Sequence, residues 1–326
     1  MKKNNTKNIR WGIIGLGKIA NKFATDLVTI ENIELVAVAS RSQQNADEFA
    51  AKYNCKKAYN SYLALVNDPE VDAVYIATPH SFHKEHTILC LQHKKAVLCE
   101  KPFAMNLQEV TEMIAVAKEN NVLLMEALWT FFLPHFNYVL EMVKSDKYGK
   151  LKEVEADFGF KSKYDVESRL LKKEIGGGGL LDIGIYPIFA AIATLGNPDS
   201  MEAKATFFET GADSECTIVF NYKEAKATLK STLLEETPTE AIFTFEKAVI
   251  KIHTRFHEPA PVTILENGKE KTMNFDCKTN GYNFEAEHFS QLIRDGKKES
   301  DIMTFEFSRN LITALDKVRN SIGLEY

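Results

Sequence analysis

A glycine turn near the N-terminus constrains the fold of this chain more than any other feature. The turn follows the apolar run Ile9–Ile14, opens a segment with helical spacing, and contains Gly15, Leu16, Gly17, Lys18, Ile19 and Ala20. Gly15 permits a tight turn, Gly17 lets the backbone approach a phosphate, and Ala20 allows close helix–strand packing. A second apolar run, 33–39, completes a strand–helix–strand unit. We therefore interpret the turn as a dinucleotide site, with residues 15–19 bordering the phosphates, rather than as a plain strand–helix connection.

The end of the second apolar run indicates which nucleotide is bound. A carboxylate that binds the ribose 2′-hydroxyl of NAD usually stands there. This chain has Ser40, Arg41 and Ser42 instead. Arg41 can pair with a 2′-phosphate through its planar guanidinium, and the two serines can add hydrogen bonds. The residues favour NADP, although Arg41 could also be a solvated residue that stacks on adenine without selecting a nucleotide.

Alternating apolar runs and helical patterns continue through the first third of the chain. Further apolar runs occupy 71–77, 96–99 and 122–125. Between the last two, Asn106 can cap a helix in which Glu109 completes an approximate capping box and one apolar stripe begins at Val110. Short strands alternating with helices are typical of a parallel, doubly wound sheet. We predict an α/β Rossmann domain over residues 1–127.

The pattern changes after residue 127. A predicted helix over 132–144 is followed by successive predicted strands at 152–161, 201–209, 215–222, 225–234 and 241–245. Several of these alternate apolar and polar residues, which indicates an antiparallel sheet with one less buried face. Two predicted helices, near 284–294 and 304–321, close the chain. We predict a second, α+β domain over 128–326.

Composition excludes several classes of protein. Hydrophobic residues make up 45% of the 326 residues and charged residues 26%, and the net charge is −5, so no overall basic field favours nucleic acid or anionic lipid. No signal-peptide pattern follows the basic N-terminus, and no apolar run approaches the roughly 18–20 residues that span a bilayer. The five cysteines are scattered without a CxxC motif, as in reduced cytosolic proteins. We expect a soluble, cytoplasmic protein.

Four motifs carry a resemblance to a known family. They are Ile76-Ala77-Thr78-Pro79, Glu100-Lys101-Pro102-Phe103, the glycines 176–179 followed by Leu181-Asp182-Ile183-Gly184-Ile185-Tyr186, and Gly281-Tyr282-Asn283-Phe284-Glu285. Together they resemble the glucose–fructose oxidoreductase/inositol dehydrogenase (Gfo/Idh/MocA) family, essentially from end to end, and most closely its dimeric dihydrodiol dehydrogenase branch. The resemblance implies an NADP enzyme that oxidises trans-dihydrodiols or aldoses. It also implies a Rossmann domain followed by a large, mostly antiparallel open sheet that forms a homodimer interface.

Hydride transfer to NADP needs a proton acceptor beside the nicotinamide. Lys101 follows a predicted strand, where ligands bind in open α/β sheets, and the resemblance implies a cis peptide before Pro102. Asp182 and Tyr186 are four residues apart and share a face if 179–195 is helical. Tyrosine titrates near pH ~10, and a nearby ammonium lowers that value. We predict Tyr186 as acid/base, Lys101 as its electrostatic partner and Asp182 as the residue that orients Lys101 or holds substrate hydroxyls.

Two further residues are predicted to contact substrate. The branch has a tryptophan like Trp129 in its pocket, which favours a substrate contact over the alternative that Trp129 is ordinary core. Phe131 stands where the branch usually has arginine, which puts the dihydrodiol substrate in doubt and favours a more apolar ligand. Arg169 could hold substrate or anchor the loop before glycines 176–179. Those glycines could approach a ligand closely or act as a hinge.

Four histidines lie close together after the run 71–77, at 80, 83, 86 and 93. Their spacing is not the i, i+4 pair of a zinc helix, so we predict no metal. Because they follow a strand, Thr78, Pro79 and His80 are predicted to border the cofactor, as are Glu100 and Lys101.

Three hypotheses remain at this stage. The first is an NADP-dependent dehydrogenase or reductase acting on the CH–OH group of a polyol, aldose or trans-dihydrodiol, with no nucleic-acid or membrane partner. The second is a non-catalytic NADP sensor of the same fold, since fold alone does not settle function. The third is a structural scaffold. The presence of Lys101, Asp182 and Tyr186 favours the enzyme.

Overall fold

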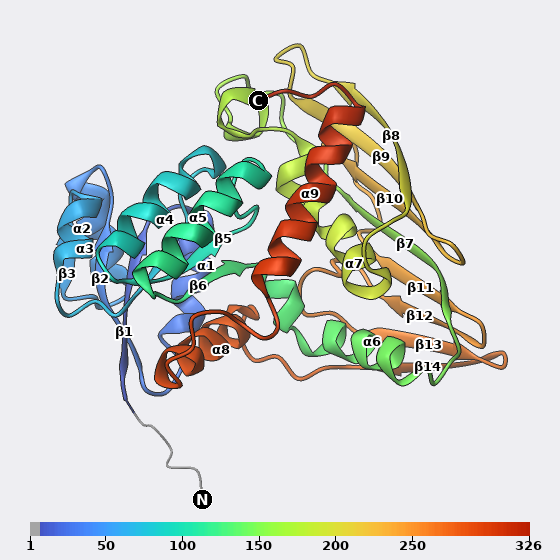
Figure 1. Ribbon diagram of the computed structural model, residues 1–326, viewed down its shortest axis with the longest axis horizontal. Coiled ribbons are helices and arrows are strands. Elements are labelled where there is room, and N and C mark those ends of the chain that lie inside the picture. The colour runs from blue at the N-terminus through green and yellow to red at the C-terminus, as the bar shows by residue number, and fades with distance from the viewer. Residues whose placement is uncertain (1–6) are drawn as a thin grey trace, which may run out of the picture. The chain divides into compact units, whose positions relative to one another are not determined.

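The computed structural model describes residues 7–326, which fold into two compact units (Figure 1). The first unit extends to Trp129 and also includes Lys278–Arg309. The second comprises Thr130–Cys277 and Asn310–Tyr326. The sequence pattern predicts a single boundary at 127/128. The structure differs because the segment Lys278–Arg309 returns to the first unit.

The first unit contains a six-stranded parallel sheet with the order β3-β2-β1-β4-β5-β6. Its strands are β1 (Ile9–Ile14), β2 (Ile33–Ala39), β3 (Lys57–Tyr59), β4 (Ala73–Ile76), β5 (Ala96–Glu100) and β6 (Leu124–Ala127). Its α-helices are α1 (Lys18–Leu27), α2 (Gln43–Lys52), α3 (Tyr62–Asn67), α4 (His83–Gln92), α5 (Leu107–Asn120) and α8 (Tyr282–Arg294). This strand order is that of a Rossmann fold, so the predicted fold class is confirmed. Only β3 has no predicted counterpart, because it has three half-buried residues and no apolar run.

A buried carboxylate on α1 attaches the returning segment to the first unit. Both carboxylate oxygens of Asp26 accept backbone N–H groups, from Asn280 at 3.1 Å and from Tyr282 at 2.9 Å. Deeper in the unit, the indole N–H of Trp11 donates to Ser290 Oγ at 3.2 Å. These partners lie more than 250 residues apart in sequence, so local pattern could not predict them.

The predicted cap of α5 is confirmed. Asn106 Oδ1 accepts the N–H of Glu109 at 2.9 Å, and the Glu109 carboxylate accepts the N–H of Met105 at 3.1 Å. One stripe of the helix is buried, through Val110, Met113, Ile114 and Ala117. The cap fixes where α5 begins, a few residues after Lys101.

A second buried carboxylate, Glu126 on β6, supports the turn that follows β5. Glu126 Oε1 accepts the backbone N–H of Phe103 at 3.0 Å. Burial raises the pKa of Glu126 to about 7, against the hydrogen bonds from Ser308 and Phe103, which favour the ionised form.

The second unit is built on an eight-stranded sheet with the order β14-β13-β12-β11-β7-β10-β9-β8. Its strands are β7 (Leu151–Gly159), β8 (Ser200–Phe207), β9 (Asp213–Asn221), β10 (Lys226–Thr232), β11 (Ala241–Phe245), β12 (Ala248–Ile252), β13 (Val262–Glu266) and β14 (Lys269–Met273). Every neighbouring pair is antiparallel except β7 with β10. The mostly antiparallel sheet is therefore confirmed. The last three strands are absent from the sequence prediction, and β14 carries almost no apolar residues.

Helices cover one face of this sheet (Figure 1). They are α6 (Pro134–Ser145), α7 (Ile185–Leu195) and the second-unit part of α9 (Phe305–Ser321). Short turns η3 (Arg169–Leu171) and η4 (Lys173–Ile175) precede a π-helical turn, η5 (Leu180–Gly184), which leads directly into α7. The other face of the sheet is half-exposed and carries ion pairs such as Lys230–Glu215 at 3.1 Å and Lys251–Glu240 at 2.7 Å.

One segment of the described chain, Lys173–Leu195, is long and apolar enough to cross a membrane by length and composition. Its most apolar window has a mean hydropathy of 1.6, and 83% of that window is buried inside the protein. Burial on all sides is also typical of the core helix of a globular protein. The segment is therefore weak evidence for a membrane span.

Replacing Asn106 by alanine removes the side-chain acceptor at the start of α5. We expect Asn106→Ala to lower the free energy of unfolding by about 1 kcal/mol, because the N–H of Glu109 then has no side-chain partner. Urea denaturation measures the change. Asn106→Ser, which restores a capping oxygen, should recover most of it; an alanine variant as stable as the wild type would contradict the assignment.

Glu126→Gln should change how stability depends on pH. A carboxyl group whose folded pKa lies above its ordinary value destabilises the fold at high pH and ceases to do so as pH falls. The glutamine variant should therefore be more stable than the wild type by about 3 kcal/mol at pH 8, and this advantage should fall to about 1 kcal/mol at pH 5. Urea denaturation at pH 5, 6, 7 and 8 measures it. A difference that does not vary with pH would show that Glu126 titrates normally.

Candidate functional site

The glycine turn lies between the carboxyl ends of β1 and β4. Gly15 has φ +85°, and a Cβ placed on it would lie 2.7 Å from the backbone of Ala77 and Thr78. Only glycine therefore fits there. Gly17 is the N-cap of α1. No side chain at this position accepts the first N–H groups of the helix, and a Cβ on Gly17 would meet open space. The turn thus combines uncapped N–H groups at a helix start with room for a ligand, as a pyrophosphate requires. A dinucleotide fits the residues present.

The residues after β2 have different local roles. Ser42 caps α2, accepting the N–H of Asn45 at 3.3 Å, and the hydroxyl of Ser40 accepts the N–H of Ser42 at 3.3 Å. Both serines therefore shape the connection in addition to any ligand contact. Arg41 is exposed. Burial lowers the pKa of His86, and the charge of Arg41 contributes in the same direction, which places Arg41 near the loop after β4.

The loop after β4 is held in place by two histidines. His83 Nε2 lies 2.8 Å from the carbonyl oxygen of Thr78, and its Nδ1 lies 2.8 Å from that of Pro102. His83 therefore lies between the loop after β4 and the loop after β5. Burial lowers its pKa to about 4, so the ring is neutral at physiological pH and donates to one of the two carbonyl oxygens. His86 Nδ1 lies 3.0 Å from the hydroxyl of Thr78.

These contacts give the histidine cluster a structural role. His80 is buried at the start of the short turn η1 (His80–Phe82), next to Pro79, with its ring 5.8 Å from that of His83. Among residues 7–326, no group of three or more His, Cys, Asp and Glu side chains is placed to hold a metal ion.

The turn after β5 contains the predicted cis peptide, Lys101–Pro102. The side chain of Glu100 is buried, accepts a hydrogen bond from the hydroxyl of Tyr75 on β4, and accepts the backbone N–H of Lys101 at 3.2 Å. Glu100 thus links the start of this turn to Tyr75 on β4. Lys101 is half-buried, and its charge contributes to lowering the pKa of His83. The predicted cofactor residues of the first unit therefore gather at the carboxyl ends of β1, β2, β4 and β5.

Trp129 and Phe131 lie in different units. The Trp129 ring is 4% exposed and stacks on Tyr282, with centroids 4.1 Å apart and planes 2° from parallel. Phe131 packs edge-on against Phe189 of α7, with centroids 5.1 Å apart. Phe131 is therefore part of an aromatic core where an arginine could not be buried without a partner.

The predicted substrate residues of the second unit lie together. Arg169 donates to both carboxylate oxygens of Asp182 at 3.1 Å. Glycines 176–179 are buried, and a Cβ on Gly177 would lie 2.6 Å from the carbonyl oxygens of Arg169 and Lys172. In this conformation the glycines allow close backbone packing, and the turn that bears Arg169 is fixed against Asp182.

Tyr186 lies one residue into α7 and is 6% exposed. Two rings that the sequence analysis missed pack beside it: His257, with centroids 4.7 Å apart, and Phe158, at 5.9 Å. His257 also stacks on Phe158 at 4.2 Å. Neither residue belongs to a local motif, so only the fold could identify them. Lys101 belongs to the first unit and Tyr186 to the second, so their pairing stays a prediction.

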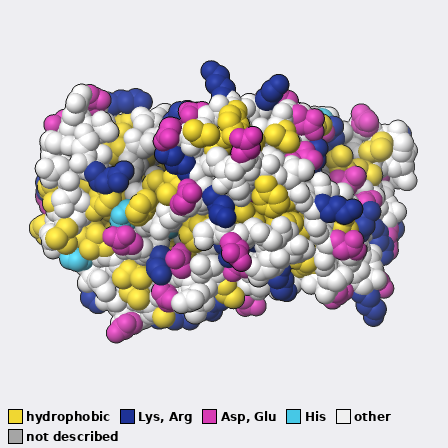
Figure 2. All heavy atoms as spheres, turned by 90° about the horizontal axis from the view of Figure 1, so that it is seen from above, with side chains coloured by type: hydrophobic (Ala, Val, Ile, Leu, Met, Phe, Trp, Pro, Cys, Tyr) yellow, Lys and Arg dark blue, Asp and Glu magenta, His cyan; other side chains and the backbone are white. Residues whose placement is uncertain are grey.

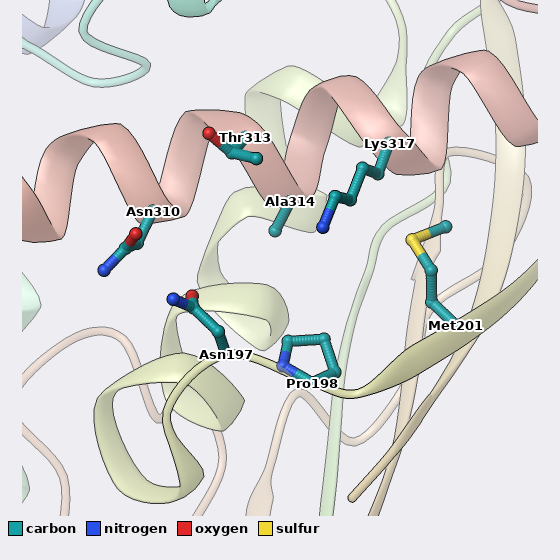
Figure 3. A pocket seen from close by; sticks show the side chains of 7 residues that line it. All are labelled: Asn197, Pro198, Met201, Asn310, Thr313, Ala314 and Lys317. Atoms are coloured by element: carbon teal, nitrogen blue, oxygen red, sulfur yellow. The ribbon is translucent and has the colours of Figure 1, made fainter.

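A separate pocket lies within the second unit, between α9 and the connection from α7 to β8 (Figure 3). Its lining residues are Asn197, Pro198, Met201, Asn310, Thr313, Ala314 and Lys317. None of the predicted site residues lines it. We therefore do not assign the candidate site to this pocket.

Known proteins resemble this chain along most of its length. A family model described as "Oxidoreductase family, NAD-binding Rossmann fold" matches residues 9–128, and one described as "GFO/IDH/MocA C-terminal domain" matches residues 136–256. A trans-1,2-dihydrobenzene-1,2-diol dehydrogenase of Xenopus tropicalis is 37% identical, covering 97% of this chain and 99% of that protein.

Two bacterial proteins are also similar. A scyllo-inositol 2-dehydrogenase (NADP⁺) of Bacillus subtilis is 35% identical, covering 98% of each chain. The solved structure of a 3-ketoreductase from Actinomadura kijaniata with NADP and TDP-benzene has a TM-score of 0.86 and 25% identity, covering 97% of this chain and 98% of the other. With both domain models and these full-length relatives in agreement, the chain belongs to the Gfo/Idh/MocA family and is an oxidoreductase.

Proposed function

We propose that this enzyme transfers a hydride between NADP(H) and the CH–OH group of a polyol, an aldose or a trans-dihydrodiol. The observation that carries the proposal is the glycine turn, where Gly15 admits no side chain and Gly17 faces open space at the start of α1. This arrangement suits the pyrophosphate of a dinucleotide.

The choice of NADP over NAD rests on the residues after β2. Arg41 is exposed and no carboxylate stands among residues 40–42. A guanidinium can bind a 2′-phosphate through two hydrogen bonds, whereas a carboxylate there would repel it. The Bacillus subtilis relative is named as an NADP⁺ enzyme, and the Actinomadura kijaniata structure contains NADP, which supports the same choice.

Residues of both units handle the proton and the substrate. The nicotinamide accepts or donates the hydride when bound. Tyr186 accepts the proton of the substrate hydroxyl in oxidation and returns it in reduction. The ammonium of Lys101 favours the phenolate of Tyr186. Asp182, held by Arg169, accepts hydrogen bonds from other hydroxyl groups of the substrate. Trp129 lines the substrate pocket.

The substrate class follows from the chemistry of these groups and from the relatives. A carboxylate and a phenol suit a ligand with several hydroxyl groups. One relative is named for a dihydrodiol and another for an inositol, and both are similar over nearly the full chain. The ring pair of Phe158 and His257 beside Tyr186 gives the same region an apolar wall.

A non-catalytic NADP sensor is the second candidate. A sensor requires the glycine turn but gains nothing from an acid/base pair. The presence of Lys101, Asp182 and Tyr186, with Asp182 fixed by Arg169, favours the enzyme. A scaffold without nucleotide would need neither feature.

We further propose a cytoplasmic homodimer that assembles through the half-exposed face of the second-unit sheet. Because that face carries paired charges, such as Lys230–Glu215, it can meet a second copy without an unpaired buried charge. Figure 2 shows acidic and basic side chains interspersed over the visible face, so no large region of one sign there favours nucleic acid or a lipid surface.

Arg41→Ala should weaken NADPH binding and leave NADH binding unchanged. Loss of charge-assisted hydrogen bonds to the 2′-phosphate should raise the Kd for NADPH roughly 10- to 100-fold. Nucleotide fluorescence titration measures both Kd values, with NADH as the internal control. Equal affinity of the wild type for both nucleotides, unaffected by the substitution, would overturn the choice of NADP.

Tyr186→Phe should lower kcat by roughly 10²- to 10⁴-fold, since it removes the proton acceptor and leaves the ring in place. Steady-state assays with scyllo-inositol, xylose and a trans-dihydrodiol measure the effect. The control is Tyr222→Phe, which removes a hydroxyl bonded to Gly196 elsewhere in the second unit. Comparable activity of the two variants would exclude Tyr186 as acid/base.

Light scattering coupled to size-exclusion chromatography should give a mass of twice 36.8 kDa at micromolar protein concentration. The expected particle is a dimer formed through the second-unit sheet. Elution with the mass of one chain would contradict the proposed assembly and leave the reaction untouched.

A further inference from the structure

Asp213 connects the sheet of the second unit to the helix that bears Asp182 and Tyr186. It is the first residue of β9 and its side chain is fully buried. Its Oδ2 accepts the backbone N–H of Leu180 at 2.6 Å. Leu180 is the first residue of the π-helical turn that leads into α7. A carboxylate at this position satisfies an N–H that has no partner within the helix and complements the helix dipole.

The glycines before the helix make room for this carboxylate. Gly178 has φ +118°, a backbone conformation that side chains rarely adopt, and a Cβ on it would overlap Asp213 Oδ1. A Cβ on Gly179 would lie 3.4 Å from Asp213 Oδ2. The sequence pattern of consecutive glycines therefore has a partner 35 residues later in the chain, where Asp213 begins a strand.

The same glycines hold the turn that bears Arg169. The N–H of Gly178 donates to the carbonyl oxygen of Leu170 at 2.8 Å, and Arg169 in turn pairs with Asp182 at 3.1 Å. Asp213, the glycines, the Arg169 turn and Asp182 thus form a closed set of contacts around the start of the helix. Movement of Asp213 would move both partners of the Arg169–Asp182 pair.

Several charged or titratable groups face Asp213. Asp182 faces it from the helix, Tyr326 from the end of the chain, and Cys216 from its own strand. Burial raises the pKa of Asp213 to about 6, against the N–H groups that favour its ionised form, and the charge of Asp182 raises it further. The ionised form, which is the better acceptor for the N–H of Leu180, therefore predominates above pH 6.

We propose that Asp213 is a positioning residue for the reaction, fixing the start of the helix so that Asp182 and Tyr186 meet the substrate in one geometry. The inference rests on the proposed function, because it assigns Tyr186 and Asp182 to the chemistry. Asp213 itself touches neither cofactor nor substrate in this account. It acts through the Leu180 N–H and the Arg169–Asp182 pair.

The second unit also offers a control. Glu246 is exposed but makes a similar contact at the turn before β7: its carboxylate accepts the N–H of Lys150 at 3.1 Å, and it faces Gly149, which has φ +76°. Glu246→Gln therefore alters a carboxylate opposite a left-handed glycine, away from the helix. Asp213→Ala removes the acceptor, and Asp213→Asn keeps an acceptor oxygen without the charge.

The first measurement is amide hydrogen exchange by mass spectrometry, with NADP⁺ present. Asp213→Ala should speed exchange at least tenfold in peptides covering 176–190, Asp213→Asn should do so less, and Glu246→Gln should leave those peptides unchanged. Exchange in Asp213→Ala that matches the wild type would overturn the proposal. This readout does not require turnover, so it stays informative if the wild type proves inactive.

The second measurement separates positioning from general stability. Asp213→Ala should lower kcat at least tenfold with the Kd for NADPH within twofold of wild type, and Asp213→Asn should recover most of kcat above pH 7. A lowered Tm of Asp213→Ala with unchanged kcat would show that Asp213 only stabilises the fold, and would overturn the proposal. Failure of the wild type to bind NADPH would instead refute the proposed function.

Discussion

The reversal of strand order between β1 and β4 is the constraint on which the candidate site depends. β2 and β4 pair with opposite edges of β1, so the chain leaves β1 through a turn pressed against the backbone that follows β4. Gly15 is the residue at that contact, with a Cβ distance of 2.7 Å to Ala77 that excludes every other side chain. The crevice that opens beyond it is where ligands bind in open α/β sheets.

Buried carboxylates that accept backbone N–H groups recur throughout the molecule. Asp26 holds the returning segment of the first unit, Glu126 holds the turn after β5, and Asp213 holds the start of the helix that bears Tyr186. Each accepts at least one backbone N–H group. Such bonds are directional, so they set loop geometry more strictly than apolar packing alone. Glu126 and Asp213 fix segments next to predicted site residues, Lys101 and Asp182 respectively.

Sequence was sufficient where a local rule governs the structure. Apolar runs located β1 and β2, the capping box located α5, and the glycine turn located the connection between β1 and α1, because each depends on neighbours in the chain. The contacts that sequence missed join residues far apart in the chain. Asp26 accepts the N–H of Tyr282, Asp213 accepts the N–H of Leu180, and the ring of His257 packs against that of Tyr186. The strands β12–β14 were missed for another reason, since the series of predicted strands ended at residue 245 and β14 is largely exposed and polar.

We propose that NADP binds at the carboxyl ends of β1 and β4 and that Tyr186 transfers the proton in the reaction. A crystal structure of the complex with NADP⁺ and a polyol tests it most directly. We expect the pyrophosphate against the N–H groups at the start of α1, the 2′-phosphate beside Arg41, and the substrate hydroxyl within hydrogen-bond distance of Tyr186. A nucleotide bound elsewhere, or a substrate hydroxyl out of reach of Tyr186, would contradict the account.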